Sequence, residues 1–399
     1  MSIGILYERS EADELGIKHT AEECGINLTY IPFRKIAVRL DKARYSIRNK
    51  GKNYSKAVED VKVVLNRAQS KSRRLVAAEL FETIDKHVLN PSIVEYICSS
   101  KLRTMLRLWK EEIQTPPTVY VPCDTHENVK TGKSLRNEDD IADLLQQEFG
   151  QLGIVVKPDA GTHGKNIRLA YNRNDLLTIL GEVQSSIINP VGVLAQRYVQ
   201  KWFYDLRIIV TKQRGKQPHC YSTAIARGGF KDFRTNTFLG NMVFGVNLPS
   251  DIRNAVVKCG GAIGKGSQAW VLAIDAMIDV GENKTADDAY VKLNLDKLEP
   301  MFNLIRTVKE DSSKLTAFSA WNKKLEEAFQ NYKDQEAYSN VKEVIEESVR
   351  ENQRKILFHE ANSCPEFWEQ TRLVAGINVA EPLLKCAQSL IDSDNRGMK

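Results

Sequence analysis

Apolar segments that alternate with helix-forming segments constrain the fold of this chain more than any other feature. In the first third, apolar runs at residues 3–7, 28–32 and 61–65 alternate with helical patterns at 11–24 and 72–84. Strands that alternate with helices favour a parallel sheet with crossover helices. The first third is therefore expected to be an α/β domain.

The remaining two thirds have a different pattern. A proline-containing linker at 114–117 is followed by short apolar runs, joined by loops, that favour an antiparallel α+β arrangement. Strands are expected at 153–157, 167–171, 193–199, 206–211, 220–226, 269–280 and 355–360. Between the last two lies the segment 281–352, whose apolar residues recur with helical spacing. This segment is expected to be an inserted helical subdomain.

Length and composition exclude several classes of protein. A chain of 399 residues is long enough for two or three domains. No uncharged apolar run approaches the roughly 18 residues of a membrane span, and the N-terminus lacks the charged and apolar blocks of a signal peptide. Seven cysteines without a Cys-x-x-Cys pair argue against a disulfide framework and a zinc site. A reducing cytoplasm is the expected compartment.

Charge is distributed unevenly. Residues 31–75 hold fourteen Lys and Arg against three acids, whereas residues 281–352 hold eleven bases against fifteen acids. A basic segment of this density favours an anionic partner. A solvated, partly flexible lobe is the alternative interpretation.

A lysine followed by a glycine-containing loop is the first candidate for phosphate binding. Lys157 ends an apolar run, and the loop 159–166 leads into the next strand. Glycines let backbone amides approach phosphate oxygens, and a lysine adds a point charge. The spacing is neither a Walker A motif nor a Rossmann fingerprint. An ordinary hairpin with a glycine-rich turn remains the alternative.

Carboxylates within apolar strands are candidates for magnesium ligands. Asp275 lies between Ile274 and Ala276, and a charge in such a strand is costly unless it is paired or bound to metal. Glu360 and Asn362 are two residues apart, so their side chains share one face of a strand. Oxygen ligands of this kind suit Mg²⁺. The alternative is that the carboxylates pair with Lys or Arg.

A cationic, glycine-containing loop at 226–237 follows a predicted strand. It includes Arg227, Lys231 and Arg234. Fixed cations can stabilise the charge of a transferring phosphoryl group. An ordinary surface loop is the alternative.

Together and in this order, these residues resemble the ATP-grasp carboxylate–amine ligases of the RimK-like branch, and most closely the LysX-like enzymes. The resemblance covers residues 1–280 and 353–393. Three further segments are similar to theirs: Ile5-Leu6-Tyr7-Glu8-Arg9, Asn66-Arg67-Ala68-Gln69-Ser70-Lys71-Ser72-Arg73, and Asn90-Pro91 leading to Cys98-Ser99-Ser100-Lys101.

The resemblance implies a fold of mixed α/β and α+β class. An ATP-grasp fold consists of a preATP-like α/β domain and two α+β lobes that clasp ATP. The implied domains are 1–115 for the N-terminal domain, 116–200 for the central lobe, 201–280 with 353–399 for the C-terminal lobe, and 281–352 for the helical insertion.

The resemblance also implies roles for individual residues. ATP phosphates would be contacted by Lys101 and Lys157 and covered by Gly161, Thr162, His163, Gly164 and Lys165. Adenine would meet the hinge Gln196, Arg197, Tyr198 and Val199, with Asp205 following in the next strand. The reacting groups would be served by Arg207, Arg234 and Asn236. Magnesium would be held by Asp275, Glu360 and Asn362.

The implied activity is ATP-dependent amide formation through an acyl-phosphate, with ATP and two Mg²⁺ as cofactors and Mn²⁺ as a substitute. The implied substrates are an amine such as an amino acid and the terminal glutamate of an acidic carrier protein or peptide. The alternative is a RimK-like glutamate ligase that acts on a small-molecule cofactor or a ribosomal-protein tail. A remote alternative is nucleic-acid binding by residues 31–75. A homo-oligomer without membrane contact is expected.

Overall fold

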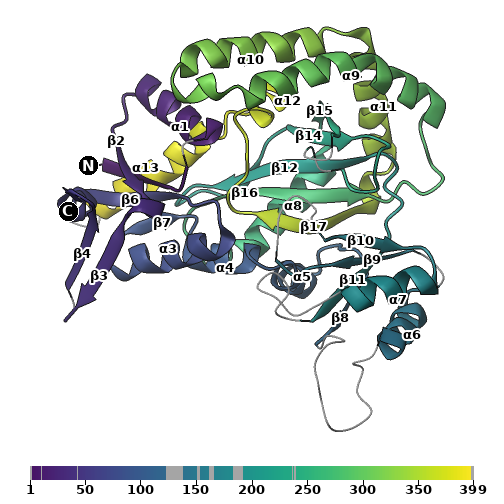
Figure 1. Cartoon of the computed structure of the whole chain (residues 1–399), viewed down its shortest axis with the longest axis horizontal. Coiled ribbons are helices and arrows are strands. Elements are labelled where there is room, and N and C mark those ends of the chain that lie inside the picture. Colours follow the sequence, from purple (N-terminus) through teal and green to yellow (C-terminus); the bar gives the residue numbers. More distant parts are fainter. Residues whose placement is uncertain are drawn as a thin grey trace.

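The computed structural model describes residues 2–9, 11–42, 44–122, 138–150, 153–160, 166–182, 192–235, 237 and 240–396. Figure 1 shows a parallel sheet at the N-terminal end, a large central sheet, a smaller lobe below it, and the long helices α9 (Asp288–Glu310) and α10 (Phe318–Lys333) above it. Among the described residues, no helix is long and apolar enough to cross a membrane.

The N-terminal sheet is parallel throughout, as the alternating pattern predicts. Its order is β2-β1-β6-β7. The strands are β1 (Ser2–Tyr7), β2 (Leu28–Pro32), β6 (Val61–Arg67) and β7 (His87–Leu89). The accompanying helices are α1 (Ala12–Glu23), α3 (Lys71–Thr83), α4 (Ser92–Cys98) and α13 (Ala380–Arg396). Neighbouring residues of β1 point to opposite faces of the sheet and so pack in different cores. Ile5 packs with α1 and α13, and Leu6 packs with α3.

The basic stretch between β2 and β6 forms a small antiparallel sheet. It consists of η1 (Phe33–Lys35), β3 (Ala37–Asp41), β4 (Arg44–Asn49), β5 (Lys52–Asn53) and α2 (Ser55–Glu59). Ile47, Tyr54 and Val58 are buried and join the core beneath this sheet. The cationic side chains are therefore displayed on an ordered hairpin.

The central lobe is built on an antiparallel sheet in the order β10-β9-β11-β8. Its elements are β8 (Thr118–Val121), α6 (Glu138–Phe149), β9 (Ile154–Lys157), β10 (Arg168–Ala170), α7 (Arg173–Glu182) and β11 (Val193–Arg197). The three strands expected here are confirmed with slightly shorter bounds, and β8 is an addition. Helix α5 (Lys101–Lys110) precedes this lobe, and its N-cap Ser100 accepts a hydrogen bond from the Arg103 N–H at 3.0 Å.

The largest sheet has the order β15-β14-β12-β16-β17, with β13 paired to β12. Its strands are β12 (Tyr204–Lys212), β13 (His219–Cys220), β14 (Thr223–Gly228), β15 (Met242–Asn247), β16 (Trp270–Ile278) and β17 (Ile356–Asn362). Helices α8 (Ser250–Ile263) and α12 (Thr371–Ala375) accompany it. The antiparallel pairing of these strands confirms the expected α+β pattern.

The segment 281–352 is helical, as its periodicity predicts. It contains α9 (Asp288–Glu310), η3 (Ser312–Leu315), α10 (Phe318–Lys333) and α11 (Glu336–Glu351), and η4 (Gln353–Lys355) follows it. Its two ends meet, because Ile278 at the end of β16 pairs with Ile356 at the start of β17. Apolar residues of these helices belong to the same core as the large sheet.

The packing of α1 against the C-terminal segment generates a stability prediction. An ideal Cβ on Gly16 would lie 2.1 Å from Cε3 of Trp368. Because the indole is buried, Gly16→Ala should lower the free energy of unfolding by about 1–3 kcal/mol through overpacking. The helical control Gly261→Ala, whose Cβ would meet nothing within 4 Å, should not. Chemical denaturation measures both, and equal stability of the two variants would contradict this packing.

Candidate active site

A row of charged side chains crosses three neighbouring strands of the large sheet. Arg207 on β12 lies opposite Asp275 on β16, which lies opposite Glu360 on β17. The Arg207 guanidinium donates two hydrogen bonds of 2.8 Å, one to each Asp275 oxygen. Asn362 donates to Asp275 Oδ2 at 3.3 Å. The three residues predicted as magnesium ligands are therefore neighbours on one face of the sheet.

A second ion pair flanks this row. Arg227 on β14 donates to both oxygens of Asp205 at 2.8 and 2.9 Å, and its Nη2 lies 3.4 Å from Asp275 Oδ2. Although burial alone would raise the pKa of Asp275, Arg207 and Arg227 hold it well below its ordinary value. Asp275 is therefore ionised despite its burial.

A β-bulge places two consecutive residues of β17 at the same site. Asp275 pairs with Glu360, but Ala276 pairs with Phe358, so His359 is the extra residue. Both His359 and Glu360 line the same cavity. Burial and then the positive charge of Lys157 lower the pKa of His359 to about 4. The imidazole is therefore neutral near pH 7.

Three lysines surround Glu360. Lys71 Nζ lies 3.5 Å from Glu360 Oε1 and has no hydrogen-bond acceptor among the described residues. Burial lowers the pKa of Lys101, and burial together with the charge of Lys101 lowers the pKa of Lys157 to about 8. Although burial would raise the pKa of Glu360, Lys101 and Lys71 lower it. This concentration of buried ammonium groups fits an anionic ligand.

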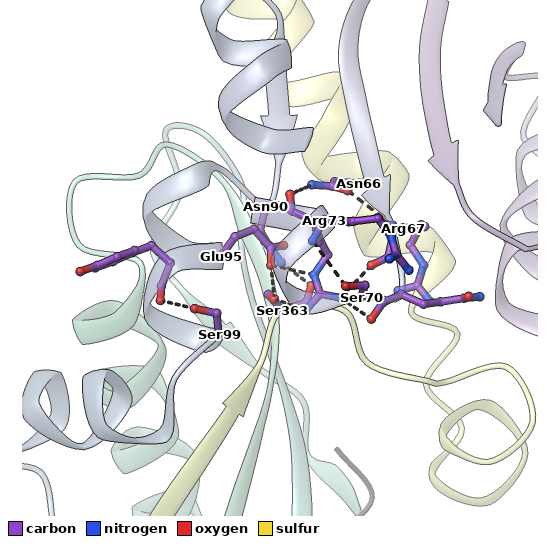
Figure 2. A network of polar contacts seen from close by, with 12 residues as sticks. Asn66, Arg67, Ser70, Arg73, Asn90, Glu95, Ser99 and Ser363 are labelled. Atoms are coloured by element: carbon purple, nitrogen blue, oxygen red, sulfur yellow. Dashed lines mark hydrogen bonds and ion pairs between the residues drawn. The ribbon is translucent and has the colours of Figure 1, made fainter. Parts of the chain in front are cut away.

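A network of buried polar contacts joins the N-terminal segment around Glu95 to Ser363 (Figure 2). Arg74 donates to Glu95 at 2.7 Å, and Ser363, the residue after β17, donates to the same Glu95 oxygen at 2.6 Å. Asn90 donates to the carbonyls of Ser363 and Val271 at 2.6 and 2.8 Å. The start of α3 is thereby attached to the end of β17, which brings Lys71 to Glu360.

These groups line a cavity of about 1240 Å³ between the parallel sheet, the large sheet and α9. Six of the predicted site residues line it: Lys101, Lys157, Arg207, Asp275, Glu360 and Asn362. Arg227, which the sequence analysis named in the cationic loop without an individual role, also lines it, as do Lys71 and His359, to which the sequence analysis gave no role. Lys71 and Arg227 lie in segments that the sequence had already indicated, whereas the bulge at His359 gives no sequence signal.

Other predicted site residues lie elsewhere or outside the described residues. Gln196 is buried against Thr118 and Met105. The N–H groups of Arg197 and Tyr198 donate to Pro117 O and Gly153 O. The described residues that line the cavity do not include Gln196, Arg197, Tyr198, Val199, Asp205 or Arg234. Gly161, Thr162, His163, Gly164, Lys165 and Asn236 lie outside the described residues.

Arg234 is held within its own loop. Its Nε and Nη2 donate to the two oxygens of Asp232 at 2.9 and 2.7 Å. The same loop is fixed by the buried Lys201, whose ammonium donates to Thr235 Oγ1 at 2.7 Å. Burial lowers the pKa of Lys201 to about 8.

The side-chain oxygens of Asp275, Glu360 and Asn362 are of the kind that binds Mg²⁺. Each carboxylate oxygen has two lone pairs, so the bonds from Arg207 leave acceptor capacity on Asp275, and Asn362 adds a carboxamide. No group of three or more His, Cys, Asp or Glu suited to a metal occurs in the described part of the chain. Two carboxylates and one amide would be enough, because Mg²⁺ usually takes few protein ligands and completes its coordination shell with water and phosphate oxygens.

The lowered pKa of Lys157 predicts a pH dependence of triphosphate binding. A bound triphosphate favours the charged lysine, so affinity should be full below pH 8 and fall as pH rises through about 8, by up to about tenfold per pH unit. Calorimetry with a nonhydrolysable ATP analogue from pH 7 to 9.5 measures this slope. Lys157→Met should flatten it, whereas the exposed-site variant Lys297→Met should keep it. An unchanged slope in Lys157→Met would assign the titration to another group.

Comparisons with known proteins identify two domains in the chain. Residues 3–97 match the LysX preATP-grasp domain, and residues 98–286 match the RimK-like ATP-grasp domain. The alpha-aminoadipate–LysW ligase LysX of Sulfolobus acidocaldarius is 26% identical over 239 residues, which cover 59% of this chain and 75% of the relative.

Two further proteins extend the comparison. The coenzyme gamma-F420-2:alpha-L-glutamate ligase of Methanocaldococcus jannaschii is 24% identical over 207 residues, 51% of this chain and 59% of the relative. The solved structure of D-alanyl-alanine synthetase A from Vibrio cholerae shares the fold with a TM-score of 0.57, 10% identity and 98% coverage of both chains. The chain belongs to the RimK-like branch of the ATP-grasp ligases and carries a preATP-grasp domain of the LysX type.

Proposed function

We propose that this protein is an ATP-dependent carboxylate–amine ligase that forms an amide through an acyl-phosphate. The observation that carries the proposal is the meeting of Lys71, Lys101 and Lys157 with the ionised carboxylates of Asp275 and Glu360 in one cavity. Ammonium groups there suit a triphosphate, and the carboxylates suit its magnesium ions.

ATP binding is assigned to the cavity lysines. Lys101 and Lys157 would contact the phosphates, and Lys71 adds a third cation. Asp275, Glu360 and Asn362 would hold two Mg²⁺, which Mn²⁺ can replace, and the metal would neutralise charge on the phosphate oxygens. The adenine hinge at 196–199, the roles of Asp205, Arg234 and Asn236, and the covering loop 161–165 are part of this proposal.

The reaction would proceed in two steps. A carboxylate oxygen of the acceptor attacks the γ-phosphorus of ATP, an O–P bond forms, and the bond to ADP breaks. The amine nitrogen then attacks the acyl carbon, inorganic phosphate leaves, and the nitrogen loses a proton. The side chains of Lys101, Lys157 and Arg207 stabilise the transferring group. Holding the reactants in position can contribute roughly 7–11 kcal/mol.

The first candidate acceptor is an acidic carrier protein or peptide, with an amino acid as the amine. Two observations support it: similarity to a LysW ligase and the cationic hairpin formed by β3 and β4, beside which Arg34 lines the cavity. A small-molecule acceptor is the alternative, favoured by similarity to the F420 glutamate ligase. A screen for phosphate release from ATP with acidic peptides, glutamylated small molecules and amino acids distinguishes them.

Several expectations remain part of the proposal. The three larger sheets support the domain division at 115, 200, 280 and 353, except that α13 packs against the N-terminal parallel sheet. A cytoplasmic location is supported by the six described cysteines, which are all free. The homo-oligomer and the absence of nucleic-acid binding stay predictions, the latter to be tested by gel shift with random RNA.

Loss of a magnesium ligand should abolish turnover. Glu360→Gln removes the charge but keeps the shape, so kcat should fall by about 100-fold or more, in keeping with the several kcal/mol that a metal-held phosphoryl oxygen supplies. Phosphate release at saturating Mg²⁺ measures it, and circular dichroism verifies folding. The exposed-site control Glu343→Gln should be unaffected. Turnover near the wild-type value in Glu360→Gln would reject the metal assignment.

Salt should weaken binding of an acidic acceptor. Raising ionic strength from ~50 to ~200 mM shortens the Debye length from above to below ~10 Å, so the KM of an acidic protein or peptide should rise. Because the hairpin supplies the attraction, Arg44→Ser combined with Arg48→Ser should reduce this dependence, and KM for ATP should not change. An acceptor KM that does not respond to salt would exclude steering by these charges.

A further inference from the structure

The last two turns of α9 line the same cavity as the ATP-site residues. The polar residues that they contribute are Asn303, Arg306, Thr307, Lys309 and Glu310. The neighbouring Phe302 and Ile305 are buried in the core. One face of α9 is therefore anchored in the protein, and the adjoining polar face borders the cavity.

The inserted helices are fixed in place by buried contacts. Tyr204 on β12 donates to Ser348 on α11 at 2.9 Å, and Tyr332 on α10 donates to the carbonyl of Val243 on β15 at 3.2 Å. The end of α9 is held by Lys309, whose Nζ lies 3.0 Å from Glu369. These contacts attach all three helices to the large sheet and to the segment after β17. The insertion therefore forms a fixed wall of the cavity.

Arg306 reaches from this wall to the loop that carries Arg234. An ideal Cβ on Gly240 would lie 3.1 Å from Arg306 Nη2, and Gly240 has a φ of +93°. The guanidinium also lies 6.0 Å from the ring of Phe302. The absence of a side chain at Gly240 thus leaves room for Arg306 beside the end of this loop, close to Thr237, which also lines the cavity.

Arg306 has no ion pair within the part of the chain that the structure describes, unlike Arg207, Arg227 and Arg234, each of which lies against a carboxylate. Even Glu310, four residues along the same helix, is not within 4 Å of it. Glu299 on the same helix interacts with Arg306 electrostatically but forms its ion pair with Lys231. A guanidinium that lines a cavity with no carboxylate at ion-pair distance is suited to bidentate recognition of a ligand carboxylate.

We propose that Arg306 binds a second carboxylate of the acceptor, so that the enzyme selects dicarboxylates or acidic peptides over monocarboxylates. This inference rests on the proposed ligase function. The lysines at the sheet would meet ATP and the reacting carboxylate, while Arg306 on the opposite wall meets the other acidic group. The insertion is then a specificity element of the active site.

Binding measurements test this inference without requiring turnover. Glutarate and butyrate are titrated by calorimetry into wild type, Arg306→Ala, Arg306→Lys and the control Lys297→Ala, each with Mg²⁺ and a nonhydrolysable ATP analogue. Wild type should bind glutarate at least about tenfold more tightly than butyrate, as expected for a charge-assisted hydrogen bond. Arg306→Ala should lose this preference, Arg306→Lys should retain part of it, and Lys297→Ala should retain all of it.

The outcomes separate the two proposals. Equal affinity of wild type for both acids, or a full glutarate preference in Arg306→Ala, would overturn the role of Arg306. A parallel loss of affinity for ATP analogue in Arg306→Ala would also overturn it, because the effect would then be structural. Wild type that binds no nucleotide, or releases no phosphate with any acceptor, would instead overturn the ligase function.

Discussion

The buried attachment of the N-terminal domain to the end of β17 is the contact on which the site depends. Arg74 and Ser363 share one oxygen of Glu95, and Asn90 exchanges hydrogen bonds with the backbone of Val271 in both directions. A buried ion pair adds little net stability but is strongly destabilising when one partner is lost. Its main effect here is geometric: it places Lys71, at the start of α3, against Glu360 on β17.

Charge balance explains how the cavity can hold a highly anionic ligand. Within the large sheet, Arg207 neutralises Asp275 and Arg227 neutralises Asp205. The lysines contributed from outside this sheet outnumber the remaining carboxylate, Glu360. The lowered pKa values of Lys101 and Lys157 reflect the cost of burying this excess, and a triphosphate that neutralises it would recover part of that cost.

Sequence reasoning succeeded where local pattern determines structure. The alternating apolar runs predicted the parallel sheet, and the two-residue spacing of Glu360 and Asn362 predicted a shared face, because strand periodicity is local. The bulge at His359 could not be predicted, since it depends on register with β16. The pairing of Asp205 with Arg227 was also missed, because it depends on the register between two strands and the sequence around either residue does not indicate the other.

The helical insertion leaves and re-enters the large sheet at one point. Asp279 N–H donates to Lys355 O at 3.1 Å, directly beyond the last pair of β16 and β17. The two strands pair up to the point where the chain leaves the sheet, so the register that aligns Asp275 with Glu360 does not depend on the length of the seventy-odd residues between them. Changes in the length of this segment would therefore leave the pairing of the two carboxylate-bearing strands unaltered.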